Sequence, residues 1–139
     1  YCKKINKKFF LANNIKLAIN LGLDGAYIPS FYKTLNTNNL NTNKKFLKIG
    51  SAHTVEEIRI KEKQGVKLIF ISPLFKSKKN KRFLNPIRFN SLTLKTNLKT
   101  IALGGINTKN IIRLKQLKSH GFASISYLET KHKFNRHIL

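Results

Sequence analysis

The chain has 139 residues, which suffices for one domain with a modest core and gives no reason to look for a second. Lysine and arginine total 28 against five acidic residues, a formal charge of +23, yet 41% of the residues are hydrophobic, so the composition excludes an intrinsically disordered chain. No apolar run has membrane-spanning length, and the basic start YCKKINKK is not followed by the apolar segment of a secretory signal.

Strand-like and helix-like segments alternate along the chain. Strands are predicted over 8–13, 25–28, 45–50, 66–72, 99–103 and 122–128. Helices are predicted over 14–22, 54–65, 86–94 and 107–121, with a polar connection over 29–45 and a basic loop over 73–83. Thr54 and Glu57 have the spacing of a capping box, so Glu56 and Glu57 are assigned to capping the second helix.

Repeated strand–helix units predict a parallel sheet, either doubly wound or closed into a barrel. In both architectures the functional groups lie at the carboxyl ends of the strands. Those ends are rich here in small and hydrogen-bonding residues, at 12–14, 27–32, 50–54, 72–79, 104–107 and 124–127. This chemistry is typical of a binding site rather than of a core.

The strand end LGGINTKN places Gly104 and Gly105 directly before a predicted helix. Glycines here leave backbone N–H groups unshielded, and a helix N-terminus adds a positive partial charge, so the segment is a candidate phosphate site. By analogy with barrels, the other half would lie after the next strand, at Ser124 to Ser126. The alternative, that the two glycines only form a tight turn, stays open.

The positive charge also has two interpretations. A strongly basic protein is a candidate for nucleic-acid binding. The lysines, however, are scattered over every surface segment together with abundant Asn and Ile, and no strand alternates basic and aromatic residues. The scatter favours compositional drift, and nucleic-acid binding is the less favoured interpretation. The single cysteine, Cys2, cannot form an internal disulfide, which favours a cytoplasmic setting.

The strand ends taken together resemble the thiamine phosphate synthase family and its thiazole tautomerase relatives. The resemblance covers about Phe9 to Leu128 and rests on LGLDGAYI, IGSAHTVEEI, GVKLIFISPLFKS and IALGGINTKNI, in that order. It implies an α/β fold of the (β/α)8 TIM-barrel type, present in residues 1–139 as one domain of about six βα units that lacks the first two. It also implies thiamine biosynthesis, in which a transferase joins hydroxymethylpyrimidine diphosphate to a thiazole phosphate and releases diphosphate.

The resemblance further implies which residues bind these small phosphorylated substrates. Ser51 matches a serine that contacts the diphosphate, and Ser77 stands where a threonine contacts the thiazole phosphate. The remaining candidates for phosphate binding are Lys79 in the basic loop, Gly104 and Gly105, and Ser124 and Ser126 after the last strand.

Magnesium is expected from the family, but its ligand positions depart from the family pattern. The two aspartates expected to bind the ion correspond to Asn13 and Tyr32 in this chain. Asp24 is the nearest acid, and it precedes its strand, at the wrong end of the sheet for a ligand. Because magnesium on a diphosphate normally needs protein carboxylates, no metal ligand is assigned, and the hypothesis is a retained phosphate scaffold with weakened synthase chemistry.

His53 is the basis for an alternative enzymatic activity. In the tautomerase relatives a histidine at this strand end is the acid–base catalyst on a thiazole phosphate, and no metal is required. His53 is therefore the catalytic candidate, with a metal-independent tautomerase as the alternative function. A non-catalytic barrel that binds phosphorylated ligands is the third possibility, and the oligomeric state is left open.

Overall fold

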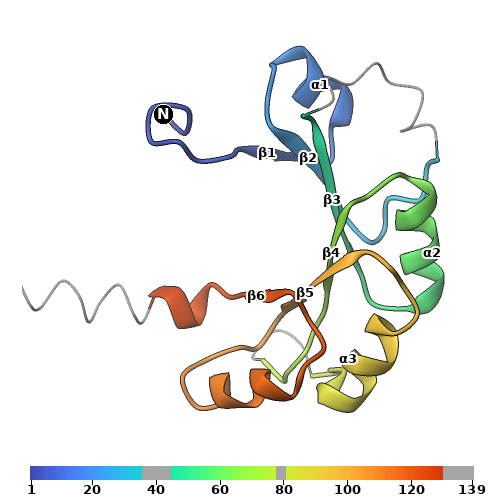
Figure 1. Cartoon of the computed structure of the whole chain (residues 1–139), viewed down its shortest axis with the longest axis vertical. Helices are drawn as coiled ribbons and strands as arrows, with labels where there is room; N and C mark the ends of the chain where they lie inside the picture. The colour runs from blue at the N-terminus through green and yellow to red at the C-terminus, as the bar shows by residue number, and fades with distance from the viewer. Residues whose placement is uncertain (36–44, 78–80, 130–139) are drawn as a thin grey trace, which may run out of the picture. The chain divides into compact units, whose positions relative to one another are not determined.

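The computed structural model describes residues 1–35, 45–77 and 81–129, and these belong to two compact units, Tyr1–Phe70 and Ile71–Leu139. Strands and helices alternate as the sequence predicts (Figure 1). In chain order they are β1 (Phe10–Ala12), α1 (Ile15–Asn20), β2 (Gly25–Ile28), β3 (Leu47–Ala52), α2 (Val55–Lys63), β4 (Leu68–Ile71), α3 (Asn85–Thr93), β5 (Lys99–Leu103), the 3-10 helix η1 (Ile111–Gln116) and β6 (Gly121–Ala123). Among these described helices, none combines the length and apolarity that a bilayer crossing requires.

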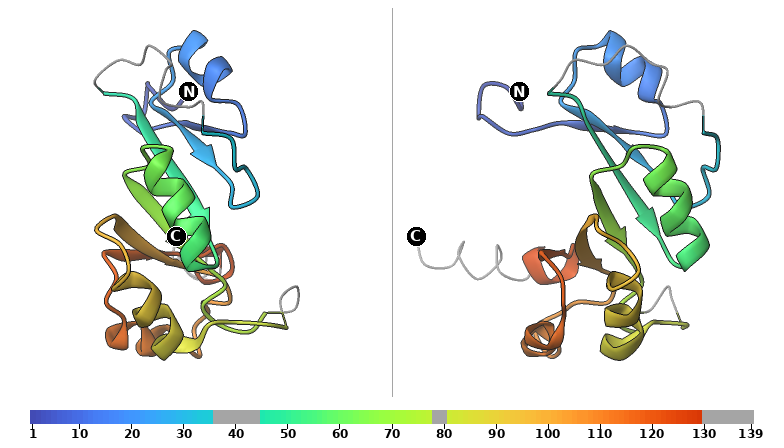
Figure 2. Two further views of the ribbon diagram at one scale, coloured as in Figure 1. Left: turned by 90° about the vertical axis from the view of Figure 1, so that its right-hand side faces the viewer. Right: turned by 45° about the vertical axis from the view of Figure 1, so that its right-hand side comes forward.

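In the first unit β1 pairs in parallel with β2, and β2 with β3, and β4 follows β3 in the order of the sheet. Gly25 in β2 lies opposite Phe10 in β1 and Leu47 in β3. Helix α1 packs on β1 and β2, and α2 packs along β3 (Figure 2). Parallel neighbours with intervening helices are the arrangement expected of consecutive βα units.

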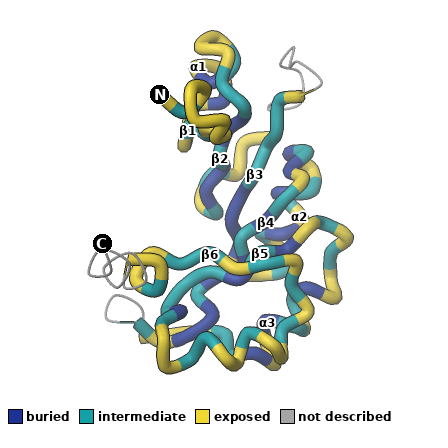
Figure 3. Tube along the Cα trace, turned by 60° about the vertical axis from the view of Figure 1, so that its left-hand side comes forward, coloured by how far each residue is buried: buried dark blue, intermediate teal, exposed yellow. Residues whose placement is uncertain are grey.

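The second half of β3 belongs to the core of this unit. Leu47 to Ile49 are half-buried, whereas Gly50, Ser51 and Ala52 are buried (Figure 3). A Cβ atom at Gly50 would lie 3.1 Å from the carbonyl oxygen of Ile28 and 3.2 Å from Cδ of Lys61. The carboxyl end of β3 is therefore enclosed between β2 and α2, which fixes the position of the residues that follow it.

In the second unit β5 and β6 pair in parallel, with Leu103 opposite Ala123. Helix α3 buries Phe89 completely. Its Asn90 side chain donates to the carbonyl oxygen of Gln116 (2.8 Å) and accepts from the N–H of Lys118 (2.8 Å). One amide side chain thus connects α3 to the segment that leads into β6.

The helix predicted over 107–121 is wrong in type and length, because the structure has only the 3-10 helix η1 (Ile111–Gln116) there. The side-chain amides of Asn107 and Asn110 both donate to the carbonyl of Gly105 at the start of the segment, in competition with helical hydrogen bonds. Two adjacent β-branched residues, Ile111 and Ile112, further lower the preference for an α-helix.

The strand predicted over 122–128 is also corrected. β6 is Gly121–Ala123, and residues 126–129 form a helical turn. The hydroxyl oxygen of Ser124 accepts from the N–H of Tyr127 (3.2 Å), which is the bond that a serine N-cap makes. Serine therefore ends the strand by starting a helical turn, a role that alternation of apolar residues alone does not reveal.

Two polar side chains of α2 and its C-cap are completely buried, those of Lys61 and Gln64. Nζ of Lys61 donates to the backbone carbonyl of Tyr32 (2.8 Å) and to Oε1 of Gln64 (3.1 Å). Burial lowers the pKa of Lys61 to about 8, and the neighbouring negative charge of Glu57 opposes this shift only in part. A buried cation bonded to uncharged oxygens is costly to keep protonated.

We expect the free energy of unfolding to rise with pH above about 8. Between the folded pKa of Lys61, about 8, and the value of about 10.4 for an unfolded lysine, the unfolded chain binds more protons than the folded chain. Stability increases with pH wherever that is so. The Lys61→Met variant removes this contribution, so urea unfolding followed by circular dichroism should show a smaller rise between these pH values.

Lys63→Met is the matched control, because Lys63 is exposed on the same helix. The control should keep the pH dependence of the wild type. An equally steep rise in Lys61→Met would show that Lys61 does not change its protonation on folding.

Candidate active site

Ser51 lies at the carboxyl end of β3 and is 5% exposed. Its hydroxyl oxygen accepts the N–H of Ser30 (3.1 Å), which belongs to the segment after β2. A serine hydroxyl that accepts one bond still has a proton to donate to a ligand oxygen. The bond brings the ends of β2 and β3 together at the position where the sequence predicts contact with a diphosphate.

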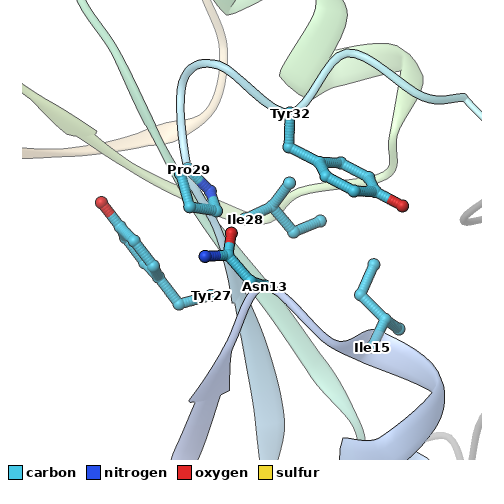
Figure 4. Close-up of a pocket in the computed structure, with 6 residues that line it drawn as sticks. All are labelled: Asn13, Ile15, Tyr27, Ile28, Pro29 and Tyr32. Atoms are coloured by element: carbon cyan, nitrogen blue, oxygen red, sulfur yellow. The ribbon is translucent and has the colours of Figure 1, made fainter.

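A shallow pocket opens beside these strand ends (Figure 4). Its lining residues come from the ends of β1 and β2 and from the start of α1, and they are Asn13, Ile15, Tyr27, Ile28, Pro29 and Tyr32. Asn13 takes up a left-handed backbone conformation (φ 64°), and its N–H donates to the carbonyl of Tyr27 (3.1 Å). Asparagine tolerates this conformation better than most residues do, so the turn after β1 suits its sequence.

His53 is exposed immediately before α2. Its backbone N–H donates to Oε2 of Glu57 (2.6 Å), and the N–H of Glu57 donates to Oγ1 of Thr54 (3.3 Å). A hydrogen bond from its own backbone N–H and one from Thr54 lower the pKa of Glu56. The predicted capping role of these acids is confirmed, and it places the His53 backbone at the rigid start of a helix.

Gly104 and Gly105 are glycines because other backbone lies against them. A Cβ atom at Gly105 would be 2.3 Å from the carbonyl oxygen of Phe75, and one at Gly104 would be 2.9 Å from Cα of Pro73. Both glycines have positive φ, 97° and 71°. The N–H of Leu74 donates to the carbonyl of Leu103 (2.9 Å), and that of Phe75 donates to Gly104 (3.1 Å). Close approach by residues 73–76 thus accounts for the glycine pair.

The loop after the glycine pair is held by side-chain amides. Nδ2 of Asn110 donates to the carbonyl of Gly105 (2.8 Å), and the N–H of Asn107 donates to Oδ1 of Asn110 (2.8 Å). The hydroxyl of Ser124 donates to the carbonyl of Ile106 (2.8 Å). The structure therefore brings the Gly104–Gly105 loop and Ser124 together, as the two halves of the predicted phosphate site require.

The other predicted phosphate residues have different positions. Ser77 is half-buried at the end of the described part of the basic loop. Ser126 is exposed at the first residue of the helical turn over 126–129. Lys79 lies outside the described residues.

Sequence analysis missed Lys61 and Gln64. A signal was present, because Lys61 follows Ile58 by three residues and therefore shares its side of α2, and Ile58 is completely buried. A lysine at a core-facing helical position is uncommon unless its head group has a partner.

The residues present do not fit a magnesium ion. The two positions expected to hold it, Asn13 and Tyr32, both line the pocket, but they offer an amide and a phenol where Mg²⁺ prefers carboxylate oxygens. Asp24 is at the opposite end of the sheet, where its Oδ2 accepts the N–H of Phe9 (2.8 Å), as its predicted structural role requires. In the described ranges, no group of three or more His, Cys, Asp or Glu side chains could hold a metal ion.

Replacing Gly105 with alanine should destabilise the protein more than replacing Gly22. Both have positive φ, which costs an alanine about 1–2 kcal/mol, but only at Gly105 would the new methyl group meet backbone atoms. The Gly22 position is open, so Gly22→Ala isolates the conformational cost. We expect Gly105→Ala to lose about 2–5 kcal/mol of unfolding free energy, the sum of conformational strain and overpacking. Equal losses in denaturant unfolding would contradict the close approach of residues 73–76.

The whole fold is similar to that of a solved structure, thiamine phosphate pyrophosphorylase from Pyrococcus furiosus. The TM-score is 0.70 at 18% identity, over 89% of this chain and 60% of that chain. This likeness confirms the predicted fold class, an α/β fold of the TIM-barrel type.

Sequence comparison gives relatives of the same kind. A thiamine-phosphate synthase of Prochlorococcus marinus strain SARG is 33% identical over 84% of this chain. A putative thiamine-phosphate synthase 2 of Aquifex aeolicus is 29% identical over 89% of it. The chain spans about a third of the length of the Prochlorococcus relative (34%) and 67% of the Aquifex one. The family model described as thiamine monophosphate synthase matches residues 1–128, and the chain belongs to that family.

Proposed function

We propose that this chain acts in thiamine biosynthesis as part of a thiamine phosphate synthase. The reaction joins hydroxymethylpyrimidine diphosphate to a thiazole phosphate with release of diphosphate. The observation that supports it best is the family match over residues 1–128, which includes the candidate residues of each unit. The same unbroken match supports treating residues 1–139 as one domain of the family.

The proposed binding roles are described for each unit separately. Ser51 would donate its hydroxyl proton to an oxygen of the diphosphate, since Ser30 already fixes the hydroxyl oxygen through its N–H. The thiazole phosphate would bind in the second unit, where the proposed residues are Ser77, Lys79, Gly104, Gly105, Ser124 and Ser126. Contact between Ser124 and the loop after Gly105 supports this grouping. His53 is proposed as an acid–base group, supported by its exposure at the end of β3.

Departure of diphosphate requires neutralisation of the negative charge that develops on it. In its family this charge is generally met by Mg²⁺, but the pocket lining here includes no carboxylate. We propose that magnesium contributes less in this chain and that basic side chains contribute more. Lys76 and Lys81, on either side of residues 78–80, are available as such charges.

The lone Cys2 is consistent with a reducing cytoplasm as the setting.

The test is formation of thiamine phosphate by the full-length protein from the two phosphorylated precursors, with and without magnesium. We expect turnover that depends only weakly on added magnesium. In Ser51→Ala, kcat/KM should fall about 10- to 100-fold, the effect of losing a hydrogen bond to a charged ligand. Ser91→Ala, which changes an exposed serine on α3, should leave the rate unchanged.

Absence of turnover under both conditions would contradict the proposed transferase activity. Turnover that is unaffected by Ser51→Ala would instead remove Ser51 from the diphosphate site.

A further inference from the structure

Lys61 and Gln64 form a buried pair that bonds to a segment far away in the chain. Besides its bond to Lys61, the Gln64 side chain donates from Nε2 to the carbonyl of Tyr32 (2.9 Å) and to that of Thr34 (2.8 Å). Nζ of Lys61 donates to the same Tyr32 carbonyl (2.8 Å). Two donors therefore converge on one backbone oxygen, and a third bond secures the segment two residues later.

The segment so held is the connection after β2. It forms an internal bond from the N–H of Tyr32 to the carbonyl of Pro29 (3.1 Å), and it carries Ser30, whose N–H bonds to the Ser51 hydroxyl. Tyr32 and Pro29 line the pocket. Because a loop lacks the repeated backbone bonds of a helix or a strand, its position depends on such side-chain donors.

Burial of these two polar side chains costs free energy. Both side chains are completely buried, and burial of a cation beside uncharged oxygens costs free energy that an apolar side chain of similar volume would not. Lys61→Met would remove one of the two donors to the Tyr32 carbonyl and the donor to Oε1 of Gln64, whereas Gln64→Leu would remove the other donor to Tyr32 and the bond to the Thr34 carbonyl. Methionine and leucine would fill the same volume without the free-energy cost of burying polar groups. What this pair adds is therefore the placement of Tyr32 and Thr34.

We propose that Lys61 and Gln64 are positioning residues, which hold the connection after β2 so that Tyr32 forms the pocket wall and Ser30 stays on Ser51. The positioning itself needs no assumption about the reaction. Its consequence for diphosphate binding rests on the proposed function.

Fluorine NMR of the full-length protein labelled with 3-fluorotyrosine tests the positioning. This chain has four tyrosines, and Tyr32→Phe identifies the Tyr32 resonance. In Lys61→Met and in Gln64→Leu we expect that resonance to shift or broaden, while the resonance of Tyr127 keeps its position. The matched control is Lys63→Met, which changes an exposed lysine on the same helix and should move neither signal.

Calorimetric binding of inorganic diphosphate supplies the second readout. The wild type and Lys63→Met should bind equally, and the two core variants should bind about tenfold more weakly. If either core variant does not fold, the other still decides between the outcomes. An unmoved Tyr32 resonance would overturn the proposal, and so would undiminished diphosphate affinity in a variant whose Tyr32 resonance has moved. Failure of the wild type to bind diphosphate would count against the proposed function, whereas the NMR result would still decide the positioning.

Discussion

Parallel pairing of neighbouring strands is the constraint on which the candidate site depends. Because β1, β2 and β3 run in the same direction, their carboxyl ends lie at one edge, where Asn13, Tyr32 and Ser51 are found. The pairing of β5 with β6 does the same for Gly104 and Ser124. The sheet thus brings together residues that are far apart in sequence. Bonds such as that from the Ser30 N–H to the Ser51 hydroxyl refine positions that the sheet already provides.

The sequence predicts the parts of the structure that depend on local patterns. The N-cap predicted at Thr54 is confirmed, since its hydroxyl accepts from the N–H of Glu57, and the Glu57 carboxylate accepts from the N–H of His53, one residue before the cap. The helix predicted over 107–121 fails because Asn107 and Asn110 bond to loop backbone, and apolar periodicity does not report this competition. Local patterns thus predict a helix correctly where polar side chains cap it, and fail where asparagine side chains compete for the same backbone groups.

Non-local packing accounts for what could not be predicted. The glycine pair was compatible with a phosphate or with a tight turn, and the structure gives a third reason, the backbone of residues 73–76 against Gly105. The phosphate role of Gly104 and Gly105 belongs to the proposed function. The backbone partner of Lys61, the carbonyl of Tyr32, is likewise 29 residues away, and no short pattern identifies it.

The pocket after β1 and β2 contains both positions at which the family is expected to hold magnesium, but the side chains at these positions differ in this chain. Asn13 and Tyr32 lie in one pocket, as two ligands of a single ion would, yet neither bears a carboxylate. The Tyr32 backbone is also bonded to a buried lysine, so the position is built around a positive charge rather than around acidic side chains. Both features, the lack of carboxylates at Asn13 and Tyr32 and the nearby buried lysine, disfavour the binding of a divalent cation at this pocket.

Manganese binding, measured by electron paramagnetic resonance on the full-length protein, tests this account most directly, because Mn²⁺ accepts the same oxygen ligands as Mg²⁺. The matched variant Asn13→Asp/Tyr32→Asp places two carboxylates in the pocket and should bind Mn²⁺ more tightly than the wild type. The account predicts no saturable Mn²⁺ site at this pocket in the wild type. A tight wild-type site that is lost on Asn13→Ala would contradict it.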